Sequence, residues 1–163
     1  MLFLTPADLR GLDSAALEEL LARSELTVAM GEGSVGGFAA AALLFADFAV
    51  LREGATLQLD AAEVWAGAVW RLGRGVLRLP ETMSAQEARE AGLCDDVTAG
   101  AAQTWLAEWM RHRSVVALDA AAALIRSRGG DRLERAEFAR LFAIGEPQKG
   151  LSAFLAKSKP TYS

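Results

Sequence analysis

Short apolar runs alternate with loops and helical segments along the first half of the chain. Residues 26–30 and 48–51 are β-prone apolar runs, and residues 39–44 between them are only alanine and leucine. A short continuous apolar run is typical of a buried parallel strand, whereas alanine and leucine favour helix. The order strand, loop, helix, strand therefore predicts a compact β–α–β unit.

Polar capping signals predict two further helices. A helix over residues 13–21 is expected to begin with Asp13 or Ser14 as its N-cap. Ser84, with a glutamate three residues later, forms the sequence of a capping box. Gly92 follows a few residues on and is expected to end that helix.

The remaining chain is mostly helical in pattern. Apolar residues recur at helical spacing over 61–70, and residues 99–142 are nearly all helical with a break at 128–131. Residues 93–97 predict one more short strand. No internal repeat is evident, and a basic tail follows the last helix.

The segment from Gly31 to Phe38 holds four glycines within seven residues. A glycine inside a helix costs about 1 kcal/mol relative to alanine, so this segment predicts a tight loop. The helix expected from about Phe38 would aim its free N–H groups, and the positive end of its dipole, at one point in space. Such a loop binds anions or stabilises an oxyanion. The alternative is a tight turn that leads into a core helix.

Composition narrows the classes of function. The chain has 163 residues, 52% hydrophobic, with a formal net charge of −4 and one cysteine. We expect one soluble domain with a real core, no general attraction to nucleic acid, and no disulfide framework. The apolar stretch 35–51 is interrupted by glycines and Asp47, so we expect a buried helix and no membrane span. The N-terminus lacks signal-peptide features, which favours the cytoplasm.

Several other residues are expected to be structural. Cys94 is interpreted as a small core residue, and His112 as lying on a solvated helix face without a metal or catalytic partner. The tryptophans are expected to be core and interface anchors: Trp65, Trp70, Trp105 and Trp109.

An ordered series of short motifs spans nearly the whole chain. In order, they are Phe-Leu-Thr-Pro-Ala-Asp-Leu (3–9), the glycine loop (31–38), the apolar helix ending in aspartate (39–47), Glu-Gly-Ala (53–55), Ser-Ala-Gln-Glu-Ala (84–88), Ala-Gly-Leu (91–93) and a lysine-containing tail (153–160). Together they resemble the enoyl-CoA hydratase/isomerase (crotonase) family. The resemblance implies an α/β fold of repeated β-β-α turns with C-terminal helices, of the ClpP/crotonase type, N-terminally shortened because the family's first strands have no counterpart.

The resemblance also implies the site. Members of the family hold the carbonyl oxygen of an acyl-CoA thioester between two backbone N–H groups. By position the first N–H group falls on Ala7. The second falls on Gly37, or on Phe38 if the loop is aligned without a gap. Fixed amide dipoles of this kind stabilise an enolate-like oxyanion. Pro6 and Phe38 stand where the family prefers glycine.

Hydratase chemistry also uses two carboxylates beside the bound acyl group. The family's first glutamate would fall in residues 39–42, which are all alanine. The second would fall near Ala61, where Asp60 or Glu63 could serve as the acid. Asp60 is the candidate acid, and the alternative is that it caps the helix that begins after it.

Cationic residues are implied to bind CoA. Arg10 and Lys157 are expected to bind CoA, since it carries several phosphate charges. Phe38 is a further expected substrate-binding residue. No metal and no cofactor beyond the CoA of the substrate are expected. The resemblance implies a homo-oligomer, a trimer or hexamer, with residues 1–100 as the α/β core and residues 101–163 as a helical association region of one domain.

Two functions follow. The first is an enoyl-CoA hydratase/isomerase-like enzyme that acts on a thioester through a backbone oxyanion hole. The second is a catalytically degenerate relative that serves as a structural or regulatory subunit, which the alanines at 39–42 favour.

Overall fold

A computed structural model of the chain describes residues 1–73, 78–127 and 130–162. Its contacts divide it into two compact units. The core unit comprises residues 2–23 and 27–102, and the C-terminal unit comprises residue 1, residues 24–26 and the chain from 103 onward.

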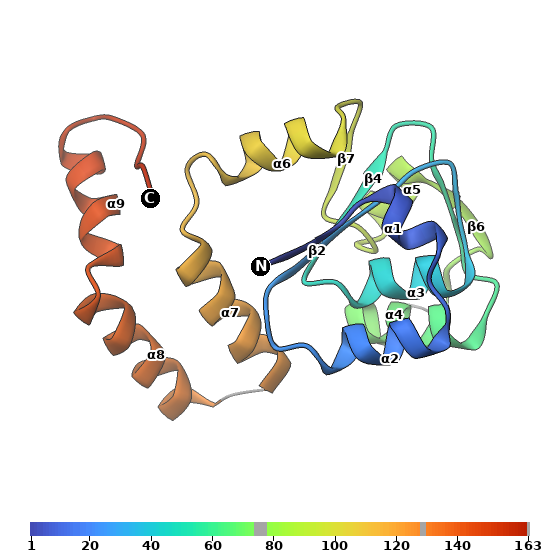
Figure 1. Cartoon of the computed structure of the whole chain (residues 1–163), viewed down its shortest axis with the longest axis horizontal. Helices are drawn as coiled ribbons and strands as arrows, with labels where there is room; N and C mark the ends of the chain where they lie inside the picture. Colours follow the sequence, from blue (N-terminus) through green and yellow to red (C-terminus); the bar gives the residue numbers. More distant parts are fainter. Residues whose placement is uncertain (74–77, 128–129, 163) are drawn as a thin grey trace. The chain divides into compact units, whose positions relative to one another are not determined.

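Two sheets organise the core unit (Figure 1). The larger is parallel, in the order β1 (Leu2–Leu4), β2 (Thr27–Gly31), β4 (Phe48–Arg52) and β7 (Asp96–Thr98). The smaller has the order β3 (Ser34–Val35), β5 (Thr56–Gln58) and β6 (Thr82–Ser84), with β3 and β5 parallel and β6 antiparallel to β5.

The core unit repeats a β-β-α unit. One copy is β2, β3 and helix α3 (Gly37–Phe45), and the next is β4, β5 and helix α4 (Ala62–Leu72). Each strand pairs with its counterpart in the other copy: Val28 with Phe48 in one sheet, and Ser34 with Thr56 in the other. This repeat confirms the expected β-β-α turns.

Helix α3 is the centre of the hydrophobic core. It packs against α4, against strands β2 and β4, and against α1 (Pro6–Arg10) and α2 (Ser14–Ala22). Residues 40–44 are fully buried, as expected for a helix that is apolar all round. A Cβ atom added at Gly67 in α4 would lie 2.7 Å from the Leu44 Cβ, so a glycine is needed where the two helices meet.

Four helices make up most of the C-terminal unit: α6 (Ala102–Met110), α7 (Val115–Ser127), α8 (Asp131–Ala143) and α9 (Glu146–Leu155). The buried Glu146 carboxylate accepts hydrogen bonds from the Ser114 hydroxyl and the Lys149 ammonium group. Ser114 also caps α7, because its Oγ accepts a hydrogen bond from the Ala117 N–H. These contacts tie the start of α7 to the start of α9.

Several predicted elements are confirmed. The β–α–β unit is β2, α3 and β4, and Asp13 is the N-cap of α2, with its carboxylate accepting from the Ala16 N–H. The capping box at Ser84 begins α5 (Ala85–Glu90). Gly92 follows that helix in the left-handed region, at φ 82°.

Three predictions were wrong in whole or in part. The strand expected over 93–97 is Asp96–Thr98, because the Leu93 N–H bonds to the Ala88 carbonyl and completes the end of α5. The helical stretch 99–142 is also interrupted between Met110 and Val115. Of the predicted break at 128–131, residues 128 and 129 lie outside the described residues, and Gly130 is the N-cap of α8. His112 lies in that turn and bonds through Nδ1 to the Pro160 carbonyl oxygen at 3.0 Å, so it does not lie on a solvated helix face.

Candidate functional site

The glycine loop turns the chain from β2 through β3 into the N-terminus of α3. Gly36 is the N-cap of α3 and offers no side chain to cap it. Gly37 is the first helical residue and has φ +53°, a left-handed conformation that L side chains rarely adopt. The sequence-based expectation of a loop is therefore correct, except that Ser34–Val35 pairs as a short strand.

Asp60 supplies the cap that Gly36 lacks. Its Oδ1 accepts a hydrogen bond from the Gly37 N–H at 2.9 Å. Its Oδ2 lies 2.7 Å from where a Cβ on Gly36 would be, and the Gln58 Oε1 lies 2.9 Å from the same point. The alternative interpretation of Asp60, as the cap of the helix that follows it, is wrong: the N-cap of α4 is Ala61, without a side-chain hydrogen bond.

Ala7 is the second residue of α1. Thr5 caps this helix in a capping box with Asp8, whose carboxylate accepts from the Thr5 N–H at 2.8 Å. The hydrogen bonds from Thr5 hold the pKa of the Asp8 carboxyl below its ordinary value. Pro6 occupies the first helical position, where its fixed φ suits the helix. The Ala7 N–H thus belongs to the first turn, whose N–H groups have no acceptor within the helix, and α1 packs against α3.

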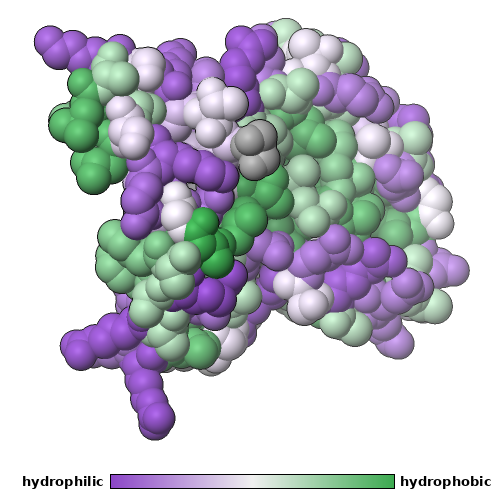
Figure 2. Space-filling view, turned by 60° about the vertical axis from the view of Figure 1, so that its left-hand side comes forward, coloured by the Kyte–Doolittle hydropathy of each residue, from purple (hydrophilic) through white to green (hydrophobic). Residues whose placement is uncertain are grey.

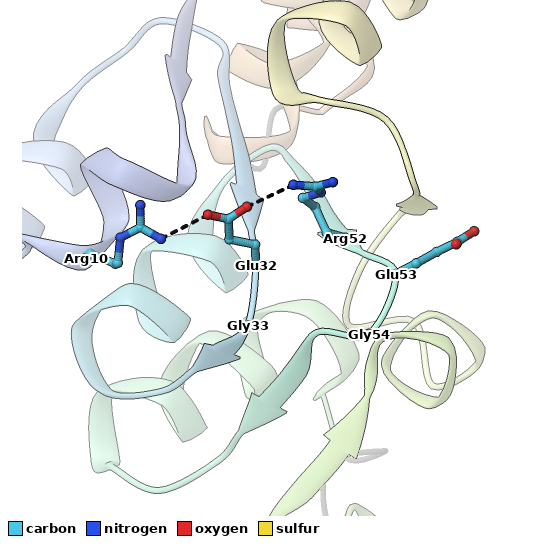
Figure 3. A pocket seen from close by; sticks show the side chains of 6 residues that line it. All are labelled: Arg10, Glu32, Gly33, Arg52, Glu53 and Gly54. Atoms are coloured by element: carbon cyan, nitrogen blue, oxygen red, sulfur yellow. Dashed lines mark hydrogen bonds and ion pairs between the residues drawn. The ribbon is translucent and has the colours of Figure 1, made fainter.

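Three charged side chains meet beside the glycine loop (Figure 3). The Glu32 carboxylate lies between the Arg10 guanidinium, at 2.9 Å, and the Arg52 guanidinium, at 3.1 Å. Hydrogen bonds from Arg10 and then Arg52 lower the pKa of the Glu32 carboxyl. These residues line an open hollow of about 410 Å³ together with Gly33, Glu53 and Gly54.

Sequence reasoning identified Arg10 but missed Glu32 and Arg52. Glu32 is the charged residue inside the glycine loop, and Arg52 ends the strand that pairs with β2, so their positions were visible in the sequence. Their convergence follows from the register of β2 with β4, in which Gly31 pairs with Leu51. That register could not be read from the sequence.

Lys157 belongs to the C-terminal unit, where it follows α9. It adopts φ +52°, and its N–H bonds to the Phe154 carbonyl while the Ser158 N–H bonds to the Ala153 carbonyl. This is the Schellman arrangement that ends a helix. The Lys157 side chain is exposed.

The region of the expected first glutamate holds no acid. Residues 40–42 are alanines with no exposed surface, packed into the core. Glu63 lies in the first turn of α4 and is exposed. Of the two candidate acids, Asp60 is the one whose carboxylate is hydrogen-bonded to the glycine loop.

Cys94 and the tryptophans lie outside the glycine loop, and most of them pack against other side chains. Cys94 is a buried free thiol, 3% exposed, as predicted. Trp105 is buried and stacks on Trp109, with ring centroids 5.7 Å apart, whereas Trp70 is 42% exposed.

Among the described residues, no cluster of His, Cys, Asp or Glu could hold a metal ion. No helix in the described ranges is long and apolar enough to cross a bilayer.

Comparison with protein-family models and with curated proteins gave no match. Solved structures do match. An enoyl-CoA hydratase/isomerase from Marinobacter aquaeolei is 19% identical with a TM-score of 0.62, over 90% of this chain and 64% of that one. An enoyl-CoA hydratase from Shewanella pealeana is 21% identical with a TM-score of 0.60, and the match covers 96% of this chain and 66% of that one. An enoyl-CoA hydratase from a Polaromonas species is 24% identical with a TM-score of 0.68, and the match covers 97% of this chain and 68% of that one.

The chain thus spans 64% of the length of the Marinobacter protein. At these identities the likeness concerns the fold, and it agrees with the repeated β-β-α units of the core. The chain has the crotonase fold, which it shares with these enoyl-CoA hydratase/isomerase structures.

Proposed function

We propose that this protein belongs to the enoyl-CoA hydratase/isomerase family and binds an acyl-CoA thioester through a backbone oxyanion hole. One observation carries the proposal: the Gly37 N–H already holds a carboxylate oxygen at 2.9 Å. Oxyanion donors act at about 2.7–3.1 Å from the oxygen on which charge develops. An anionic oxygen therefore fits at this amide.

In this proposal the thioester carbonyl oxygen lies between the N–H groups of Ala7 and Gly37. Both amides belong to first helical turns, so their hydrogens are free of bonds within their helices, and the positive dipole end of α3 adds to the field. Charge that develops on the carbonyl oxygen as an enolate forms is then stabilised without reorganisation.

Asp60 is the proposed acid. A carboxyl group beside a bound enoyl thioester can take a proton at one carbon and return it at another, as isomerisation requires. Hydration adds the oxygen of water to the β-carbon and a proton to the α-carbon, and one carboxylate would have to serve both transfers. We therefore propose isomerase or hydratase chemistry with a single acid.

The CoA moiety would bind at the hollow beside the loop. Arg10 is 66% exposed and Arg52 is 39% exposed, so both guanidinium groups have donors that can reach phosphate oxygens. Phe38 is half-buried in the first turn of α3, where its exposed part can contact the acyl chain. Lys157 is a further proposed phosphate contact. No cofactor other than the CoA of the substrate is proposed.

We also propose that the chain forms a homo-oligomer, a trimer or hexamer, through the helices of residues 101–163. The proposed location of this oligomer is the cytoplasm. Hydrophobic side chains reach the surface in patches between hydrophilic ones (Figure 2). On α8 and α9, Phe138 is 61% exposed, Phe154 78% and Leu155 72%. Apolar groups that remain this exposed favour burial against another copy.

A catalytically degenerate relative is the second candidate. The buried alanines at 40–42 supply no acid, and the Asp60 carboxylate already accepts the hydrogen of the Gly37 amide. A structural or regulatory subunit would keep the fold and the exposed helices without turnover.

Calorimetric titration with crotonyl-CoA, with free CoA as the control ligand, tests the proposal. We expect saturable binding that depends on the acyl group, and weaker binding of both ligands by an Arg10→Gln and Arg52→Gln double variant. Arg140→Gln is the control, since Arg140 pairs with Glu137 on an exposed helix of the other unit. If crotonyl-CoA and free CoA both fail to bind at millimolar concentration, the thioester function is refuted. Acyl-dependent binding without hydration or isomerisation would favour the degenerate relative.

A further inference from the structure

Asp60 and a thioester carbonyl would need the same hydrogen. A backbone N–H carries one hydrogen, and that of Gly37 is donated to the Asp60 Oδ1. An oxyanion at the Gly37 amide would also lie within a few ångströms of the Asp60 carboxylate. Two negative charges this close repel each other. The two acceptors cannot both be held there.

We propose that Asp60 is a built-in competitor of the substrate: its carboxylate closes the Gly37 amide in the free protein, and thioester binding displaces it. This proposal rests on the proposed function, because it concerns the same amide. It makes the free protein self-inhibited at its oxyanion hole and adds a cost to the binding of every thioester.

The surroundings of Asp60 allow the side chain to move while its backbone stays in place. The preceding residue, Leu59, is 2% exposed, and its N–H donates to the Glu81 carbonyl at 2.7 Å. The following residue, Ala61, is the N-cap of α4 and accepts from the N–H groups of that helix. Asp60 itself is exposed. Rotation of this exposed side chain away from the Gly37 N–H therefore releases the amide without unfolding either neighbour.

The absence of a side chain at Gly36 completes the arrangement. The Asp60 Oδ2 and the Gln58 Oε1 fill the space where a Cβ on residue 36 would lie, at 2.7 and 2.9 Å. The Asp60 carboxylate therefore packs directly against the backbone of Gly36 as well as bonding to Gly37. An alanine at position 36 would push Asp60 away from the amide.

The test compares the affinities of wild type, Asp60→Ala and Asp60→Asn for crotonyl-CoA and for free CoA. Removing the competitor should tighten crotonyl-CoA binding by roughly tenfold, which corresponds to losing one hydrogen bond to a charged group. Asparagine keeps a neutral acceptor, so Asp60→Asn should gain less. Binding of free CoA, which has no thioester carbonyl, should be unchanged.

Asp13→Ala is the matched control. It also removes a carboxylate that caps a helix, because Asp13 accepts from the Ala16 N–H at 2.8 Å, but the helix that it caps is α2. Its crotonyl-CoA affinity should equal that of wild type. Hydrogen exchange gives a second readout without ligand: the Gly37 amide should exchange faster in Asp60→Ala than in wild type.

The outcomes separate the two proposals. Equal or weaker crotonyl-CoA binding by both Asp60 variants, with clear binding by wild type, overturns the competitor and leaves the thioester site standing. If no variant binds crotonyl-CoA, Asp60→Ala included, opening the amide does not create a thioester site and both proposals fail. If Asp60→Ala does not fold, Asp60→Asn decides, because it preserves the shape and a cap.

Discussion

The Arg71 guanidinium closes the C-terminal end of α3 by donating from Nε to the Leu44 carbonyl oxygen at 2.8 Å. It also donates to the Ala46 carbonyl oxygen and, at 3.1 Å, to the Asp95 carboxylate. Helix C-termini leave carbonyl groups without partners and attract cations. One side chain from α4 therefore holds the end of α3 against the segment that enters β7.

Arg71→Lys should destabilise the fold by about 3 kcal/mol, because the Arg71 side chain is 11% exposed and an ammonium group cannot reproduce its forked contacts. Guanidinium denaturation measures the change as a lower midpoint with an unchanged slope. Arg140→Lys, in the exposed pair with Glu137, should stay within about 0.5 kcal/mol. Equal effects of the two substitutions would show that the cap of α3 contributes little.

Gly67→Ala tests the contact between α3 and α4. The new Cβ would lie 2.7 Å from the Leu44 Cβ in a fully buried region, so we expect a loss of about 2 kcal/mol through overpacking. Gly11→Ala is the control, because a Cβ there meets no atom within 4 Å and the backbone has φ −99°. Thermal unfolding compares the two; a Gly67→Ala midpoint at or above that of wild type contradicts the close approach.

Cys94 should be inert in the folded protein. Burial, followed by the charge of the neighbouring Asp95, raises the pKa of its thiol to about 11. A chromogenic disulfide reagent at about pH 8 should react with it only after unfolding. Because the folded pKa lies above the ordinary value of 9.0, the contribution of this group to stability is present below that pH and is lost as the pH rises toward 11.

The control for this pH dependence is Cys94→Ala, in which the fall in stability between pH 9 and 11 should be smaller. Rapid, stoichiometric modification of the folded wild type would contradict the burial of Cys94.

The exposed apolar residues of α9 should drive self-association. Replacing Phe154 and Leu155 by serine removes two side chains that are 78% and 72% exposed, and should shift an oligomer toward the monomer in size-exclusion chromatography with light scattering. Leu21→Ser, at 47% exposure in α2, is the matched control and should leave the mass unchanged. A wild type that remains a monomer over a roughly hundredfold range of concentration would refute the association.

The sequence predicts this fold best where local chemistry decides. The capping box at Ser84 and the cap at Asp13 require only residues three positions apart. The strands β2 and β4 are long enough to be recognised as apolar runs, whereas β3 has two residues and β5 and β6 have three each. Strands so short carry no periodic signal, and for this reason the β-β-α repeat was expected only from the family resemblance and not from the hydrophobic pattern.

The site depends on contacts that no local pattern encodes. Asp60 caps a helix that begins 23 residues earlier in the chain, and the pattern around it favours the helix that follows. The position of Gly37 in the loop was predictable, but which acceptor its N–H holds depends on the pairing of β3 with β5. The resemblance implied the role of the loop, whereas only the structure shows that the Asp60 carboxylate bonds to its Gly37 amide.

The most direct test of the oxyanion hole is to follow the backbone amide resonances of Ala7 and Gly37 by nuclear magnetic resonance during titration with crotonyl-CoA. If the thioester carbonyl binds between them, both resonances should shift saturably with the same apparent affinity, and free CoA should move neither. If both amides stay unperturbed while the protein is folded and the ligand is in excess, the chain has no backbone oxyanion hole.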